Sequence, residues 1–396
     1  MASFQGVEEI PGLYGSLRIE EKVIQQIWAD QDFNDLELHT ECGKRLIISN
    51  PGIWNRAEEG PDFKNASLSI DQLKQEGDIE IHFYSSDWEN HGHNRDANYN
   101  RVALHVTLFP EAKKRTPCQT VKGVQIPLLV LLPHLRQSLE EHMESIAIEN
   151  LSAYVAKNTG SLYSRIDQFE VTQKNHELAK ERWLKKKQFA QKRLQKSKQE
   201  EAFHQCFLEV LGYRRNRAIM SKIGQSHPTQ EWKCGGIDPD EVFQSEKSWK
   251  LKGLRPANHP RKRLRQYGEL WRANPNWIED LLKINIPFDG NSEGSNRKNL
   301  GIHNLKKLWI DEILCGVWGG TRVDTLWVDA CLPLLAEVHR RDYFPTWFHW
   351  FAGDFPDPLK EVSRSMGIAG HSRAKPFSNG PLQGLLGYCI KKGILG

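Results

Sequence analysis

The stretch Gly60–Val106 reads GPDFKNASLSIDQLKQEGDIEIHFYSSDWENHGHNRDANYNRVALHV. Short runs of alternating apolar and polar residues, typical of β-strands, flank a polar segment. Inside a strand pattern, acidic and histidine side chains are costly to bury unless they are paired or bound to something. We therefore expect a functional site here. Its candidate residues are Asp62, Asp78, Glu80, His82, Asp87, His91, His93, Asp96 and His105.

The rest of the N-terminal region predicts a helix followed by a sheet. The apolar residues of 18–30 recur at helical spacing, and the later segments alternate as strands or end in turn residues. The predicted elements are a helix over 18–30, a hairpin over 36–52, a turn at 75–77, and strands over 66–70, 78–83 and 102–109. Ser86 followed by Glu89 resembles a capping box and predicts a short helix or an ordered loop.

The strand over 78–83 carries the first candidate site. Asp78, Glu80 and His82 alternate with apolar residues and so share one face. Asp62, in a turn, and Glu80 can share one Mg²⁺ or Mn²⁺, because these hard cations prefer oxygen ligands. His82 can then position or deprotonate an attacking water. The alternative is that Asp62 caps a turn and that Glu80 and His82 are half-solvated strand residues.

The histidines offer a second chemistry. His91 and His93, separated by one glycine, and His105 on a nearby strand provide three ligands for Zn²⁺, with Asp87 and Asp96 as acceptors that orient the imidazoles. The alternative is that the first two hold a tight turn and that His105 is a hydrogen-bonded core residue. Since this spacing is common, the pattern favours Mg²⁺ or Mn²⁺ over Zn²⁺ as the cofactor.

Length and composition limit the class of protein. A chain of 396 residues with 39% hydrophobic residues predicts more than one domain, each with a real interior. The seven cysteines include no C-x-x-C pair, and the longest apolar run, 126–132, is too short to span a membrane. We expect a cytoplasmic protein without a membrane partner, divided into 1–132, a long helical segment over 133–212, and a helical domain over 213–396.

Two basic helices are predicted downstream, over 165–212 and from 255 to 271, the second with Pro260 in its first turn. Clustered basic residues point to DNA or RNA as a partner, held through phosphate contacts. The alternative is that they only solvate exposed helices. The candidate nucleic-acid-binding residues are Lys185, Lys186, Lys187, Lys192, Arg193, Arg255, Arg261, Lys262 and Arg263.

Two family resemblances rest on these residues. Pro61-Asp62, followed by Glu80-Ile81-His82 on a later strand, resembles the core of the PD-(D/E)XK nuclease superfamily. The phrase GPDF…GDIEIH…SDW…HGH…LHV, together with RPAN at 255–258, closely resembles a bacterial family called domain of unknown function 2851. The second resemblance covers most of the chain, and the first covers about residues 15–110.

The nuclease resemblance implies a fold and an activity. The fold is an α/β (α+β) N-terminal, restriction-endonuclease-like αβββαβ core followed by a mainly α-helical C-terminal region. The activity is metal-dependent hydrolysis of phosphodiester bonds, with Asp62 and Glu80 as metal ligands, Glu21 as an additional ligand, and His82 where the superfamily has lysine. A lysine is charged at neutral pH and a histidine only partly so. A nuclease fold without catalysis that binds nucleic acid, and a histidine-based metallohydrolase, therefore remain open.

Overall fold

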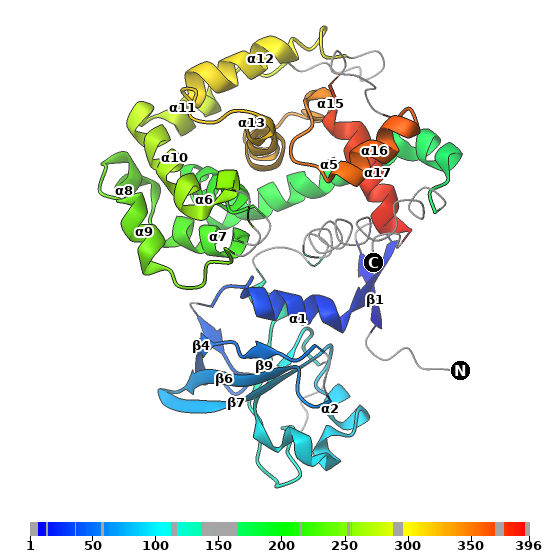
Figure 1. Ribbon diagram of the computed structural model, residues 1–396, viewed down its shortest axis with the longest axis vertical. Helices are drawn as coiled ribbons and strands as arrows, with labels where there is room; N and C mark the ends of the chain where they lie inside the picture. Colours follow the sequence, from blue (N-terminus) through cyan, green and yellow to red (C-terminus); the bar gives the residue numbers. More distant parts are fainter. Residues whose placement is uncertain are drawn as a thin grey trace. The chain divides into compact units, whose positions relative to one another are not determined.

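A computed structural model places a mixed α/β unit, Met1–Met143, before a helical unit, Glu144–Gly396 (Figure 1). The structure describes residues 7–12, 15–35, 37–56, 59–111, 117–135, 139, 142, 165–213, 216–251, 254, 256–287, 296–368 and 376–392. Most of the helix predicted from 133 onward, and Arg255, lie outside these residues.

The N-terminal unit is built on a mixed sheet. Among the described residues it has seven strands, in the order β3-β4-β6-β7-β8-β9, and β5 pairs with β6 off this path. Strands β3 to β7 pair antiparallel, whereas β8 and β9 are added parallel to β7. A separate hairpin joins β1 and β2. The strands are β1 (Val7–Gly12), β2 (Gly15–Glu20), β3 (Leu38–His39), β4 (Arg45–Asn50), β5 (Ile53–Trp54), β6 (Phe63–Ile70), β7 (Leu73–His82), β8 (Val102–Thr107) and β9 (Leu128–Val130).

The first helix, α1 (Glu21–Asp30), packs its apolar face into the core of this unit. Ile24, Ile27 and Trp28 recur at helical spacing and are fully buried with the apolar residues of β6, β7 and β8. The helix predicted over 18–30 is confirmed, but it starts three residues later because β2 occupies the first positions.

The turn between β6 and β7 differs from the prediction. The predicted turn at Gln75–Gly77 is wrong, because the chain reverses at Asp71 and Gln72 and β7 runs straight through the predicted position. Both turn residues have positive φ, 47° and 70°, as a two-residue hairpin turn requires. Glycine or asparagine usually occupies such a turn. Neither is present at Asp71 and Gln72, so the sequence only weakly indicates a turn there.

Gly77 lets β7 approach β8 closely. A Cβ at this position would lie 2.5 Å from the carbonyl oxygen of Arg101 and 2.6 Å from Cβ of Ala103. A glycine is therefore needed where β8 joins the sheet. The residues that follow, from Asp78 to His82, pair in parallel with β8.

The crossover from β7 to β8 passes through α2 (Asp87–Asn90) and two 3₁₀ turns, His93–Arg95 and Ala97–Arg101. The short helix after Ser86 is confirmed, but the Ser86 side chain makes no capping bond. Oδ2 of Asp87 accepts the main-chain N–H of Tyr84 at 3.0 Å and holds the entry to the helix instead.

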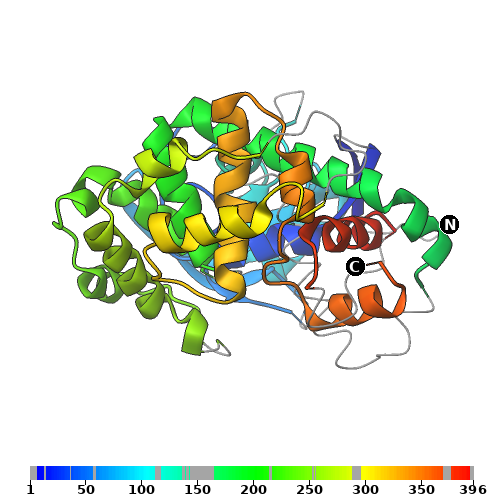
Figure 2. The same cartoon turned by 90° about the horizontal axis from the view of Figure 1, so that it is seen from above.

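The second unit is helical, as expected for the C-terminal region. Helices α5 and α17 lie side by side (Figures 1 and 2), and a Cβ on Gly384 would lie 2.3 Å from the carbonyl oxygen of Asn175. The helices are α5 (Gln168–Lys196), α6 (Gln199–Leu211), α7 (Arg217–Ser226), α8 (Thr229–Lys233), α9 (Pro239–Ser245), α10 (Pro260–Ala273), α11 (Trp277–Leu282), α12 (Ile302–Leu308), α13 (Thr321–Thr325), α14 (Leu332–His339), α15 (Phe344–His349), α16 (Asp357–Ser365) and α17 (Asn379–Lys391).

The single long helix predicted over 165–212 is two helices. The chain becomes extended at Ser197 and Lys198, with ψ near 150° at both, so α5 ends and α6 begins. An ion pair between Arg193 and Glu209 connects the two helices across this break. The absence of proline made one continuous helix the simpler prediction.

Tryptophan forms much of the core of the helical unit. Trp277, Trp327, Trp347 and Trp350 are fully buried, which agrees with a packing role. The seven cysteines are free thiols. Among the described helices, none combines the length and apolar character needed to cross a membrane.

Candidate functional site

Asp62 and Glu80 are joined by hydrogen bonds through the main chain. The N–H of Asp62 donates to Oε2 of Glu80 at 3.0 Å, and the N–H of Ile81 donates to Oδ2 of Asp62 at 3.0 Å. Gln25 of α1 donates from Nε2 to Oδ1 of Asp62 at 2.6 Å. Three segments, α1, the turn before β6 and β7, thus hold the two carboxylates in fixed orientations.

Glu21 adds a third carboxylate to this group. Burial, together with the charges of Asp62, Asp87 and Glu80, raises the pKa of Glu21 to about 8. The pKa of Asp62 is raised by burial and then by Glu80, and burial raises that of Glu80 to about 8. Carboxylates that disfavour one another's ionised form in this way are suited to a positive ligand.

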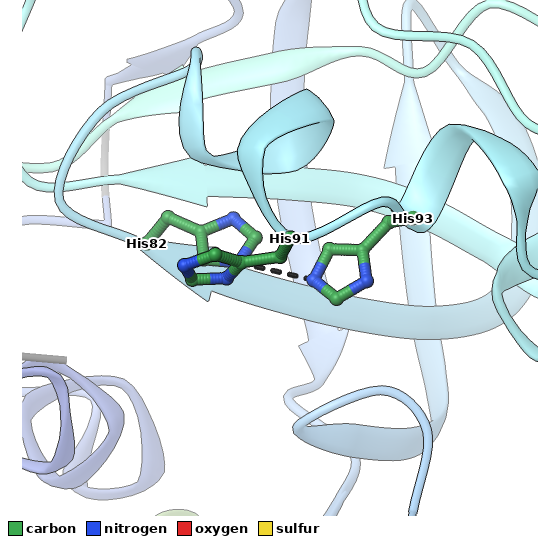
Figure 3. Close-up of side chains that lie close together, drawn as sticks. All are labelled: His82, His91 and His93. Atoms are coloured by element: carbon green, nitrogen blue, oxygen red, sulfur yellow. Dashed lines mark hydrogen bonds between the residues drawn. The ribbon is translucent and has the colours of Figure 1, made fainter. Parts of the chain in front are cut away.

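Four histidines meet on the other side of Glu80, and Figure 3 shows three of them, His82, His91 and His93. Nε2 of His82 lies 3.1 Å from Nδ1 of His91, 3.3 Å from Nε2 of His93 and 3.4 Å from Oε1 of Glu80. Oε1 of Glu80 is also 3.2 Å from Nε2 of His93. On the opposite edge of the His82 ring, Nδ1 lies 2.9 Å from Nε2 of His105. His82 is therefore the centre of the cluster.

These imidazoles are held neutral. Burial lowers the pKa of His82, and the neighbouring His105, His93 and His91 lower it further. Burial also lowers the pKa of His93 to about 4 and, together with His93, that of His105 to about 3. His82 therefore cannot supply the positive charge of the lysine whose place it takes in the nuclease resemblance. Neutral imidazoles are, however, the form that ligates metals.

Aromatic rings fix the position of His93. The Tyr99 ring stacks on it with centroids 3.8 Å apart, and Trp88 contacts it edge-on at 5.3 Å. Trp88 also lies 5.4 Å from the His105 ring. Tyr99 and Trp88 therefore pack against the histidine rings of the site.

The other acidic candidates hold the main chain. Oδ1 of Asp78 accepts the N–H of Asn65, a residue with positive φ at an irregularity of β6. Oδ1 of Asp96 accepts the N–H of Asn98 and caps a 3₁₀ turn. Asp87 binds the main chain of Tyr84, as described above. Asp87 and Asp96 therefore support the crossover that carries His91 and His93, whereas Asp78 supports β6.

The basic candidates lie in the helical unit, and several of them form ion pairs there. In α5, Lys186 contacts Asp329 at 2.8 Å and Lys187 contacts Glu337 at 3.4 Å. Lys185 is half-buried and Lys192 is exposed. Part of the positive charge of this helix therefore stabilises its own unit.

The basic residues of α10 also include both paired and exposed side chains. Arg261 binds Asp240 at 3.0 Å, and Arg263 is buried with Nη2 donating to Asn258 at 3.0 Å. Lys262 is exposed.

Two contacts of the site were not predicted from the sequence. Gln25, which orients Asp62, lies one helical turn after Glu21, and this spacing was the available signal. His105 pairs with Nδ1 of His82 instead of joining His91 and His93 as a third ligand. No sequence signal distinguishes these two positions for a histidine on β8.

A family model described as "Protein of unknown function (DUF2851)" matches residues 21–235, more than half of the chain. The chain belongs to the DUF2851 family. The DUF2851 match begins at the first residue of α1 and contains every carboxylate and histidine of the site. No curated protein and no solved structure matches the chain.

Proposed function

We propose that this DUF2851 protein is a metal-dependent hydrolase of phosphodiester bonds, a nuclease acting on DNA or RNA. The observation that carries the proposal is the joining of Asp62 and Glu80, from separate segments, into one hydrogen-bonded carboxylate pair beside Glu21. Paired carboxylates on an α/β scaffold are suited to hold a divalent cation against a phosphate.

The order of elements supports the proposal. α1 precedes the antiparallel strands β4, β6 and β7, and a crossover with the short helix α2 leads to the parallel strand β8. The resemblance to PD-(D/E)XK nucleases predicts a helix, three strands, a helix and a strand in this sequence. The two carboxylates also occupy the positions that the resemblance assigns to metal ligands.

The carboxylates fit an oxygen-preferring cation. Each carboxylate oxygen has two lone pairs, and the bonds from Gln25 and Ile81 use one on each oxygen of Asp62. Asp62, Glu80 and Glu21 would therefore hold Mg²⁺ or Mn²⁺. When bound, this ion supplies an activated water and offsets the charge on the phosphate.

The protein's own groups supply orientation. Gln25 and the N–H of Ile81 prevent rotation of the Asp62 carboxylate, and the N–H of Asp62 does the same for Glu80. His82 is neutral, so it acts as a hydrogen-bonding or ligating group and not as a cation. Exposed cations of the helical unit, such as Lys192 and Lys262, provide phosphate contacts elsewhere on the substrate.

The test is cleavage of plasmid DNA and of a structured RNA by the full chain with Mg²⁺, Mn²⁺ or Zn²⁺. Asp62→Asn and Glu80→Gln are expected to lower the rate by at least about 100-fold, as loss of one electrostatic catalytic group commonly does. Glu76→Gln is the matched control, because Glu76 lies on the same strand β7 but is exposed. Its rate should equal that of the unaltered protein.

Two results would contradict the proposed hydrolase. Tight binding of DNA or RNA with no cleavage under any of the three metals would show a binding module instead of an enzyme. Cleavage that persists in both Asp62→Asn and Glu80→Gln would place the reaction elsewhere in the chain.

A further inference from the structure

We propose that the N-terminal unit binds a zinc-type transition metal between Nε2 of His82, Nδ1 of His91, Nε2 of His93 and Oε1 of Glu80. This site goes beyond the proposed function and does not depend on it. It is also distinct in donor chemistry from the carboxylate pair, because it uses Oε1 of Glu80 whereas Oε2 faces Asp62.

Four of the six distances between the donor atoms match the edges of a zinc tetrahedron. Metal–ligand bonds of about 2.0–2.1 Å place tetrahedral ligand atoms about 3.3–3.4 Å apart. From Nε2 of His82 the distances to the other three donors are 3.1, 3.3 and 3.4 Å. The donors of Glu80 and His93 are 3.2 Å apart, and one ligand atom from each of the three histidines lies within 4.8 Å of the others. His82, His93 and Glu80 are therefore already spaced as ligands of one ion, and His91 lies close enough to His82 to be the fourth.

Hydrogen bonding at Nε2 of His82 accounts for only one of the three short contacts that this atom makes. A ring nitrogen of a neutral imidazole carries either one proton or one lone pair. Nε2 of His82 nevertheless faces His91, His93 and Glu80 at hydrogen-bond distance or slightly beyond it. At most one of these three contacts can receive its proton. A cation at their centre turns all four atoms into ligands at once.

His105 completes the site from behind. With the metal on Nε2 of His82, the ring proton of His82 lies on Nδ1 and is donated to Nε2 of His105, 2.9 Å away. The proton of His105 then lies on Nδ1, which has no hydrogen-bond partner among the described residues. One buried ring N–H, that of His105, is therefore left without a hydrogen bond among the described residues. The hydrogen bond between His82 and His105 fixes the orientation and tautomer of His82.

The donor set selects the metal. Three imidazole nitrogens and one carboxylate oxygen suit Zn²⁺ and its neighbours, whereas Mg²⁺ and Ca²⁺ prefer oxygen ligands. Entry is available from one side: His91 is partly exposed, whereas His82 and His93 are buried. His91 is therefore the ligand that an arriving ion meets first.

The experiment uses the full chain after removal of bound metal with a chelator. Zn²⁺, Mn²⁺ and Mg²⁺ are titrated separately, without nucleic acid, and bound metal is counted per chain. We expect one Zn²⁺ per chain, bound far more tightly than Mg²⁺, and Co²⁺ should give the visible absorption of a tetrahedral site. His91→Ala and His93→Ala should each weaken Zn²⁺ binding by more than about 100-fold, beyond the range for loss of an outer-shell partner.

His39→Ala is the matched control, because His39 lies in the same unit and is exposed on strand β3. Its Zn²⁺ affinity should be unchanged. If His93→Ala fails to fold by circular dichroism, the partly exposed His91 provides the second variant, His91→Gln, with the same expected loss. Zn²⁺ bound no more tightly than Mg²⁺, or unchanged affinity in the folded ligand variants, would overturn the site.

The two proposals fail separately. Stoichiometric Zn²⁺ binding without any cleavage leaves this site in place and removes the proposed hydrolase. Mg²⁺-dependent cleavage by protein that does not bind Zn²⁺ removes this site and leaves the hydrolase.

Discussion

The main-chain N–H of Asp62 donates to the Glu80 carboxylate, while the Asp62 carboxylate accepts the N–H of Ile81, next to Glu80. This reciprocal pair locks the turn before β6 to the end of β7. The two carboxylates are thereby held close together although the charge of Glu80 disfavours the ionised form of Asp62. Without a bound cation this arrangement lowers the stability of the folded protein. The loss can be measured as a free energy of unfolding.

Asp62→Asn should stabilise the metal-free protein. The asparagine side chain keeps an oxygen that accepts the N–H of Ile81. It removes a buried carboxyl group whose pKa is raised by burial and by Glu80. We expect the free energy of unfolding to rise by about 1 kcal/mol, typical of substitutions that relieve functional strain. Urea unfolding in the presence of a chelator measures it. An equal or larger gain with Mg²⁺ present would contradict a cation-binding role for Asp62.

Tyr99 should act as a positioning residue for metal binding. Its ring stacks on His93 at 3.8 Å, so Tyr99→Ala frees that imidazole and should weaken Zn²⁺ binding about 10-fold, at the low end for outer-shell changes. Tyr99→Phe keeps the ring and should keep the affinity. Metal titration compares the two variants, and equal losses in both would mean that the hydroxyl matters and the stacking does not.

Gly77→Ala should destabilise the N-terminal unit. The added methyl group would meet the main chain of Arg101 at 2.5 Å and Ala103 at 2.6 Å, so β7 and β8 must separate. The expected loss is about 1–3 kcal/mol, as for overpacking in a core. Gly319→Ala is the control, since no atom lies within 4 Å of its added methyl group. Urea unfolding measures the stability of both variants. An equal loss in Gly77→Ala and Gly319→Ala would contradict the prediction.

Glu209 should stabilise the helical unit in a pH-dependent way. Burial alone would raise its pKa, but Arg193 and Arg217 outweigh burial and keep the pKa below its ordinary value. Glu209→Gln leaves two partly exposed arginines without their carboxylate and should cost about 2–3 kcal/mol, less than the loss for fully buried pairs. Glu200→Gln, an exposed change on the same helix α6, is the control.

The sign of the pH effect follows from the lowered pKa of Glu209. A carboxylate whose pKa is depressed by folding contributes stability above its unfolded pKa of 4.5, and this contribution is lost as pH falls through the lower folded value. The difference between the unaltered protein and Glu209→Gln should therefore be constant near pH 7 and shrink below about pH 4.5. Unfolding measured from pH 7 to pH 3 checks this, and a difference that grows with acid would contradict it.

Local patterns predicted much of the fold. The spacing of Ile24, Ile27 and Trp28 predicted α1, because one face of that helix is buried in the core. The alternation over 78–83 predicted β7, because successive side chains point to opposite faces of a strand and here one face is apolar and the other carries the site. The hairpin turn at Asp71 and Gln72 was missed, because its positive φ values are imposed by strand pairing and not by glycine. The break between α5 and α6 was missed for a similar reason, since packing and not proline ends α5.

The sequence by itself determined which residues are the candidates for the proposed site: Asp62, Glu80 and His82 follow from strand alternation and motif spacing. Only the tertiary structure decided how they are grouped. It placed Oε2 of Glu80 against Asp62 and Oε1 against His82 and His93, and it moved His105 behind His82. The physical reason is that a strand pattern specifies the face on which a side chain lies. Which atoms meet depends on the crossover and on the parallel register of β7 and β8, and no local periodicity encodes either.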